Sequence, residues 1–193
     1  MTTAKELYNK VFGTIYKHDN NQDEYDRVFD EVSLIAQRGW EPFILLLSEV
    51  MTRKRSWPIE LSGSAMDSYL LYLAAGENND DRKNIDKLNY QKSRDIFFND
   101  ALRLNLNIVC AFQDILDTET LNLLNDINSI AESLNLIVHK MDETGLWLAI
   151  SKTGEIPDKD VEMIKNEKAE SSPIEAEILR KYLLIKIGKW KGI

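Results

Sequence analysis

His139 is the residue of this 193-residue chain that comes closest to a catalytic group, since the chain has only two histidines. It lies in LIVHKM, residues 136–141, a segment with the composition of a β-strand. Pairing across the following turn predicts that His139 faces Leu148 on an otherwise apolar surface. A histidine there is a candidate acid or base, because burial changes its pKa. No aspartate, serine or cysteine stands at a helpful local spacing, so a hydrogen-bonded structural histidine is the simpler interpretation.

The basic triplet Arg53, Lys54 and Arg55, with Trp57 just after it, is a second candidate. Basic side chains beside an aromatic ring are typical of nucleic-acid grooves. The same charges also complement the negative end of a helix dipole, because the triplet closes an apolar helical segment. These four residues are therefore a candidate partner-binding site, with helix capping as the alternative. Whether they share a face with the basic tail after Arg180 stays open.

Metal binding is disfavoured by the sequence. Asp19, Asn21 and Asp23 offer oxygen atoms at alternate positions, a spacing that can surround calcium. Such a loop needs glycine at its sixth position, where this chain has Glu24. An acidic helix start explains the segment better. A single cysteine excludes a cysteine-rich zinc site. We expect no metal and no cofactor.

The charge of the chain limits its partners. With 24 basic and 32 acidic residues the net charge is −8, which disfavours nucleic acid and anionic membranes. The segment from Arg180 onward is basic and has no acidic side chain, so the rest of the chain is more acidic than the total. A basic protein partner fits this acidic body.

The expected compartment is the cytoplasm. No stretch reaches the roughly 20 apolar residues that a membrane-spanning helix needs, so we expect no membrane partner. The opening residues MTTAKELYNK contain no apolar secretory signal. The single cysteine also fits a reducing environment.

The first half of the chain has helical periodicity. Apolar residues recur every three or four positions in residues 4–16, 25–36 and 40–52, and in a segment from about Pro58 to Ala75. The segment WEPFILLLSEV is too short to span a membrane and is expected in the core. A less regular helix is expected within residues 85–100.

The second half begins with a period of two. Apolar and polar residues alternate after Leu102, which predicts a strand with one buried face. A helix is expected from Asp117, followed by the strands LIVHKM and LWLAIS. The turn between these strands ends at Gly145. In this hairpin Lys140 and Trp147 are expected to be cross-strand neighbours in a cation–π contact.

Two helices are expected to complete the chain, one near Asp158–Lys168 and one opened by Ser172. The second half therefore has the order β-α-β-β-α-α. Its first two strands should be parallel if they are neighbours, and the third antiparallel to the second.

The predicted fold class is α+β and mainly helical, with a helical N-terminal half packed on a small mixed β-sheet. We expect a helical lobe over residues 1–76, a polar link with a poorly patterned helix over 77–101, and a small α/β lobe over 102–193. The link is short, which favours one shared core.

These features favour a non-catalytic interaction protein whose acidic body binds a protein partner, a description that fits immunity, antitoxin and regulatory proteins. One alternative is an enzyme acting on a nucleotide or nucleic acid, using His139 and the Arg53-Lys54-Arg55 cluster. The other is a structural subunit that self-associates through the tail helix. The oligomeric state and the partner's identity stay open.

Overall fold

The computed structural model describes residues 22–53, 59–74, 104–110, 118–166 and 177–189. The chain divides into two compact units. Unit 1 comprises Met1–Lys54 and Met66–Asp100, and unit 2 comprises Arg55–Ala65 and Ala101–Ile193. The predicted α+β class is confirmed, since helices occur together with a mixed β-sheet. The helices expected within residues 4–16 and 85–100 lie outside the described residues.

Unit 1 contains the helices α2 (Gln22–Arg38), α3 (Glu41–Thr52) and α4 (Tyr69–Ala74). Gly39 follows α2 with a φ of 62°, a left-handed conformation that glycine adopts without steric penalty. The prediction that α3 is a core helix is confirmed. Its buried residues are Phe43, Ile44, Leu45, Leu46, Leu47, Ser48, Val50 and Met51.

The helix predicted from Pro58 to Ala75 is wrong in its first part. Ile59–Ser62 form strand β1, and the 3-10 turn η1 (Ser64–Asp67) follows before α4 begins. Gly63 turns the chain with a φ of 100°. A Cβ added there would lie 2.9 Å from the backbone oxygen of Asn105, so β1 and β2 approach closely only because residue 63 is glycine.

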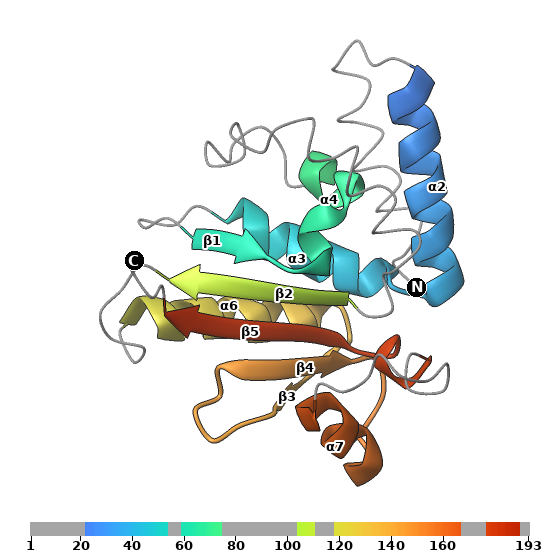
Figure 1. Cartoon of the computed structure of the whole chain (residues 1–193). Coiled ribbons are helices and arrows are strands. Elements are labelled where there is room, and N and C mark those ends of the chain that lie inside the picture. Colours follow the sequence, from blue (N-terminus) through green and yellow to red (C-terminus); the bar gives the residue numbers. More distant parts are fainter. Residues whose placement is uncertain (1–21, 54–58, 75–103, 111–117, 167–176, 190–193) are drawn as a thin grey trace. The chain divides into compact units, whose positions relative to one another are not determined.

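Unit 2 contains a five-stranded sheet with the order β1-β2-β5-β4-β3 (Figure 1). The strand β2 pairs in parallel with β5, and all other neighbours are antiparallel. The β3–β4 hairpin is therefore confirmed, whereas β2 and β3 are not neighbours. The four strands after β1 are β2 (Leu104–Cys110), β3 (Ile137–Lys140), β4 (Trp147–Ser151) and β5 (Leu183–Lys189).

The last predicted helix is wrong in its C-terminal part, and its expected start at Ser172 lies outside the described residues. Residues 177–179 are helical, but Leu183–Lys189 form the strand β5 between β2 and β4. Tyr182 and Ile185 are both buried. Leu183, Ile185 and Ile187 alternate with other residues, so the segment also has the period of a strand.

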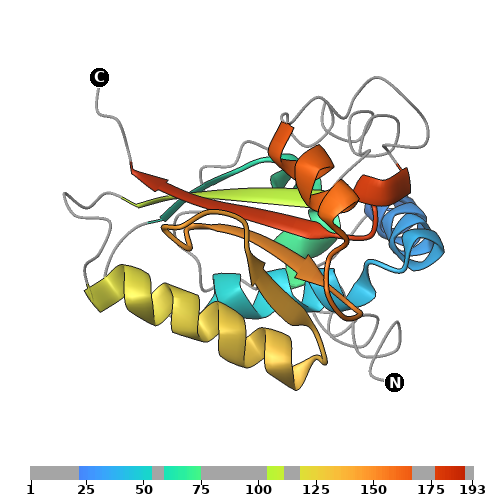
Figure 2. The same cartoon turned by 90° about the horizontal axis from the view of Figure 1, so that it is seen from below.

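The helices α6 (Thr118–Ser133) and α7 (Asp158–Asn166) lie on opposite faces of the sheet (Figure 2). On the α7 side, Met141, Ala149 and Leu184 pack with Ile164 of α7 in one apolar cluster. The face opposite to α7 is the main core of unit 2. It carries the buried side chains of Leu104, Leu106, Ile108, Leu148, Ile150, Leu183, Ile185 and Ile187.

Candidate functional site

The β3–β4 register corrects the predicted surroundings of His139. Met141 pairs with Trp147 through the Met141 amide, so the connecting loop contains five residues, 142–146. His139 consequently faces Ala149 and not Leu148. The expected contact of Lys140 with Trp147 is wrong for the same reason, because a shift of one residue moves a side chain to the other face.

Trp147 has a different cationic partner. Its ring lies 4.4 Å from Nζ of Lys186, which is its neighbour on β5. The cation–π contact predicted for Trp147 therefore exists, but with a residue of the strand that the sequence analysis took for a helix.

His139 is half-buried and makes a side-chain hydrogen bond within the hairpin. Its Nε2 lies 3.0 Å from Oγ of Ser151. The Ser151 Oγ also lies 3.2 Å from the backbone oxygen of Thr153, so the hydroxyl has two neighbours within hydrogen-bond distance.

Burial lowers the pKa of His139 below its ordinary value of 6.5. The negative charge of Glu155 and the backbone of Gly154 act in the opposite direction without reversing the shift. The ring is therefore mainly neutral at pH 7. A neutral imidazole with one nitrogen on Ser151 fits the structural role that the sequence favoured.

His139 nevertheless lies at a pocket, which we name the His139 pocket. Its volume is about 270 Å³, and it is formed by the end of β3, the loop after β4 and the helix α7. Glu155 and Lys165 bring opposite charges to it, and neither was a candidate in the sequence because the two reach His139 only through the fold. The lining residues are His139, Lys140, Met141, Glu155, Ile156, Val161 and Lys165.

The helix α7, which forms one wall of the pocket, is fixed to the sheet by a polar and an apolar contact. Asp160 is buried in its first turn and accepts a hydrogen bond of 2.5 Å from the Tyr182 hydroxyl. Burial and the adjacent Asp160 carboxylate raise the pKa of Tyr182, so the hydroxyl keeps its proton. Ile164, one turn later, packs into the apolar cluster under the helix.

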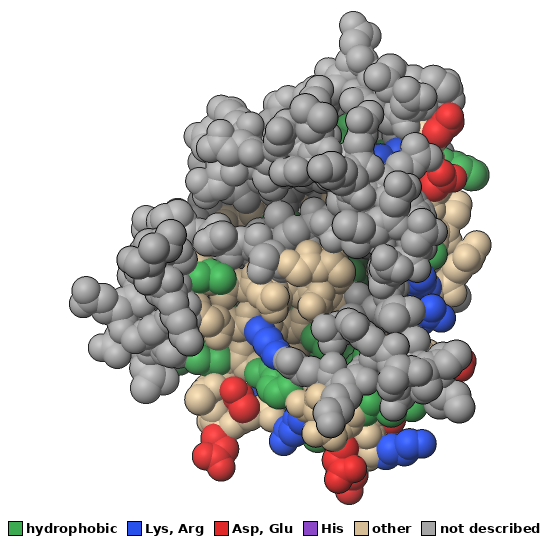
Figure 3. All heavy atoms as spheres, viewed as in Figure 1, with side chains coloured by type: hydrophobic (Ala, Val, Ile, Leu, Met, Phe, Trp, Pro, Cys, Tyr) green, Lys and Arg blue, Asp and Glu red, His purple; other side chains and the backbone are tan. Residues whose placement is uncertain are grey.

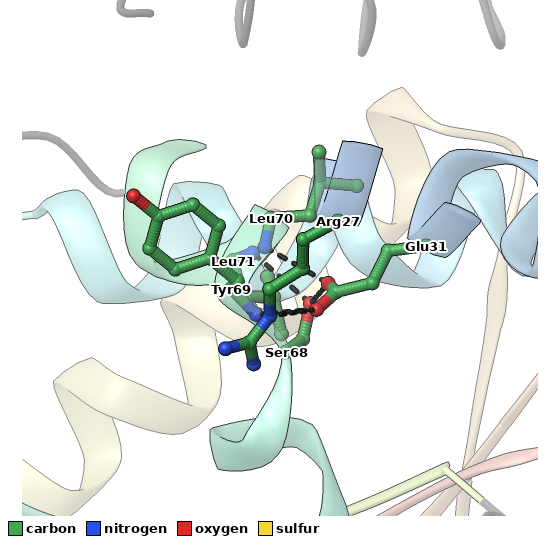
Figure 4. A network of polar contacts seen from close by, with 6 residues as sticks. All are labelled: Arg27, Glu31, Ser68, Tyr69, Leu70 and Leu71. Carbon is green, nitrogen blue, oxygen red and sulfur yellow. Dashed lines mark hydrogen bonds and ion pairs between the residues drawn. The ribbon is translucent and has the colours of Figure 1, made fainter. Parts of the chain in front are cut away.

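Unit 1 contains a buried polar network around Glu31 (Figure 4). The Glu31 carboxylate accepts hydrogen bonds from the Ser68 hydroxyl and from the amides of Tyr69 and Leu70. Arg27 adds an ion pair at 3.3 Å and places its guanidinium 5.0 Å from the Tyr69 ring. Burial raises the pKa of Glu31, while the Leu70 amide and Arg27 oppose that shift. Every contact is a donor to the carboxylate, so the network is structural.

The opposite side of α2 reaches the surface. Phe29 is 70% exposed, and Asp26, Asp30 and Ala36 are also exposed. Figure 3 shows hydrophobic and acidic side chains next to one another along this helix. The sequence analysis placed Phe29 and Ala36 on the core stripe. Successive helical residues are about 100° apart, so Phe29 cannot share the buried side of Val28.

Of the basic triplet, only Arg53 is among the described residues. It is exposed and ends α3 in an extended conformation, with φ −67° and ψ 125°. Lys54, Arg55 and Trp57 lie outside the described residues. Arg53 belongs to unit 1 and His139 to unit 2.

Two further properties concern the described part of the chain alone. Within it, no group of three or more histidine, cysteine, aspartate or glutamate side chains could hold a metal ion. None of the helices placed there is both long and apolar enough to cross a membrane. Comparison with protein-family models, curated proteins and solved structures found no match for the chain.

Proposed function

We propose that this chain is a non-catalytic protein that binds a basic segment of a partner protein through the exposed face of α2. The observation that carries the proposal is the 70% exposure of Phe29 on a helix whose other side is buried. Leaving a phenylalanine in water forgoes about 1.5–3 kcal/mol of burial free energy. Exposed aromatic residues of this kind are enriched at protein interfaces.

The charges beside Phe29 define the chemistry of the partner. Asp26 lies one turn before Phe29, and Asp30 follows it; both side chains are exposed. A partner that presents an apolar pocket ringed by lysine or arginine would match this surface in shape and charge. The net charge of −8 would draw such a partner towards the chain from a distance.

The surroundings of His139 support the non-catalytic part of the proposal. Its ring is held inside the protein by hydrogen bonds with the Ser151 hydroxyl and with the backbone of Gly154. The neighbouring carboxylate, Glu155, acts on His139 through its charge. An enzyme that acts on a nucleotide, the alternative from the sequence, would need a base with an acceptor nitrogen aimed at its substrate.

Site-specific photocrosslinking in the native host tests the proposal. A photoreactive amino acid at position 29 should capture a basic protein. The same label at position 121 is the matched control, because Leu121 of α6 is also a large exposed apolar residue, at 50%. The label there should not capture that protein.

The captured protein is then purified and its affinity measured. We expect Phe29→Ala to weaken binding by about tenfold or more, as truncation of an aromatic anchor does. Leu121→Ala should leave the affinity unchanged. Equal binding by the two variants, or crosslinks only between copies of this chain, would contradict the proposal; the second result would support the self-associating subunit instead.

A further inference from the structure

The His139 pocket combines three kinds of lining group. Glu155 brings a carboxylate, and Lys165 brings an ammonium group from the helix α7. The apolar lining consists of Met141, Ile156 and Val161. The pocket is partly open to solvent and its exposed lining is more polar than apolar, so its charged groups would contribute most to the recognition of a ligand.

Lys140 contributes less directly than Lys165. Its aliphatic stem passes the turn, with Cδ 3.3 Å and Nζ 3.7 Å from the position that a Cβ of Gly145 would take. Its backbone belongs to β3, an edge strand of the sheet. Lys165 is therefore the cation that we assign to a ligand.

We propose that the His139 pocket binds a free α-amino acid with a branched apolar side chain. In this assignment the ligand carboxylate pairs with Lys165, its ammonium group pairs with Glu155, and its side chain contacts the apolar lining. The site is independent of the α2 face, because all of its residues lie in unit 2.

The charge pattern selects a zwitterion. A ligand with only a carboxylate would meet the repulsion of Glu155, and a ligand with only an amine would meet that of Lys165. His139 adds a hydrogen-bonding ring without a full charge at pH 7, because burial lowers its pKa. The volume of about 270 Å³ is near the lower end for small-molecule sites, which fits one amino acid.

The first test follows the His139 Hε1 resonance by NMR while leucine is added. Two analogues serve as comparisons: isocaproate, which lacks the amine, and isoamylamine, which lacks the carboxylate. We expect a saturable shift with leucine, and roughly two- to fivefold weaker binding of each analogue, as expected for one partly exposed ion pair. No saturation with leucine, or equal affinity for all three, would overturn the proposal.

The second test assigns each charge to its residue. Lys165→Met should weaken leucine binding and leave isoamylamine binding unchanged or tighter. Glu155→Gln should weaken leucine binding and leave isocaproate binding unchanged or tighter. The controls are Lys159→Met and Glu162→Gln. Both residues are exposed on α7 and do not line the pocket. If the control variants weaken leucine binding as much as the pocket variants do, the His139 pocket is not the leucine site. Neither of the two tests depends on the Phe29 surface, so the pocket and the proposed partner interface can fail separately.

Discussion

The carboxylate of Glu31 in α2 accepts a hydrogen bond of 2.9 Å from the backbone amide of Leu70 at the start of α4. A second amide, that of Tyr69, donates to the same carboxylate at 3.0 Å. Ser68 completes the cap, since its hydroxyl accepts from the Leu71 amide. One helix thus caps another. A helix as short as α4 is not stable alone, so this contact explains why it forms at residue 69.

Glu31→Gln should therefore destabilise the protein strongly. The glutamine NH₂ group would face neighbours that are all donors, and Arg27 would lose its buried partner. We expect a loss of about 3–5 kcal/mol in the free energy of unfolding, measured by urea denaturation. Glu49→Gln, which changes an exposed carboxylate of α3, is the control and should have little effect. A loss below about 1 kcal/mol would show that the network is not needed.

Leu47→Ala tests the core of unit 1. The side chain is fully buried in α3, so its truncation leaves a cavity. We expect a loss of about 2–5 kcal/mol in the free energy of unfolding. Leu121→Ala, at a position that is 50% exposed, should cost far less. Similar losses for the two variants would mean that the α3 stripe is a surface.

Gly63→Ala tests the turn that follows β1, the strand that the sequence analysis predicted as part of a helix. The added Cβ would meet the Asn105 backbone at 2.9 Å, and a φ of 100° strains any residue but glycine. We expect a loss of about 2 kcal/mol or more in the free energy of unfolding. Gly188→Ala is the matched control in β5, because an added Cβ there meets nothing within 4 Å. The control should stay within about 0.5 kcal/mol of the wild type.

Sequence periodicity predicted α2, α3 and the strands of the β3–β4 hairpin because each follows one apolar period, and the acidic start at Asp117 predicted α6. It failed at β1 and β5. The residues next to each of these strands also fit a helical period. Both segments form strands because they pair with β2, which the local sequence does not show. Short apolar segments are ambiguous in this way, since tertiary contacts override local preference.

The candidate site was less predictable than the fold. Asp142 closes the hairpin loop with hydrogen bonds from the Gly145 amide and the Thr144 hydroxyl, and this five-residue loop shifts the register by one position. That shift moved His139 away from its predicted neighbour and next to Ser151. Lys165 joins the site because Tyr182 holds α7 in place. No local spacing contains this information.

Tyr182→Phe tests how firmly α7 is held. The change removes the donor to Asp160 and leaves a buried carboxylate short of one partner. We expect a loss of about 1–3 kcal/mol in the free energy of unfolding. In a double-mutant cycle, adding Asp160→Asn should lose less than the two single changes together. Strictly additive losses would show that the hydrogen bond does not couple α7 to β5.

His139 should titrate below its ordinary pKa of 6.5, because burial disfavours the charged ring. In the unfolded chain the ring takes up its proton near pH 6.5. As the pH falls from there towards the lower native pKa, the unfolded state binds more protons, so the folded state loses stability. Above pH 6.5 the ring is neutral in both states and contributes no pH dependence.

NMR titration of the Hε1 resonance should give a midpoint below 6.5. His139→Gln should remove this part of the stability loss on acidification. A midpoint at or above 6.5 would mean that Glu155 outweighs burial, and that the His139 pocket carries an additional positive charge at neutral pH.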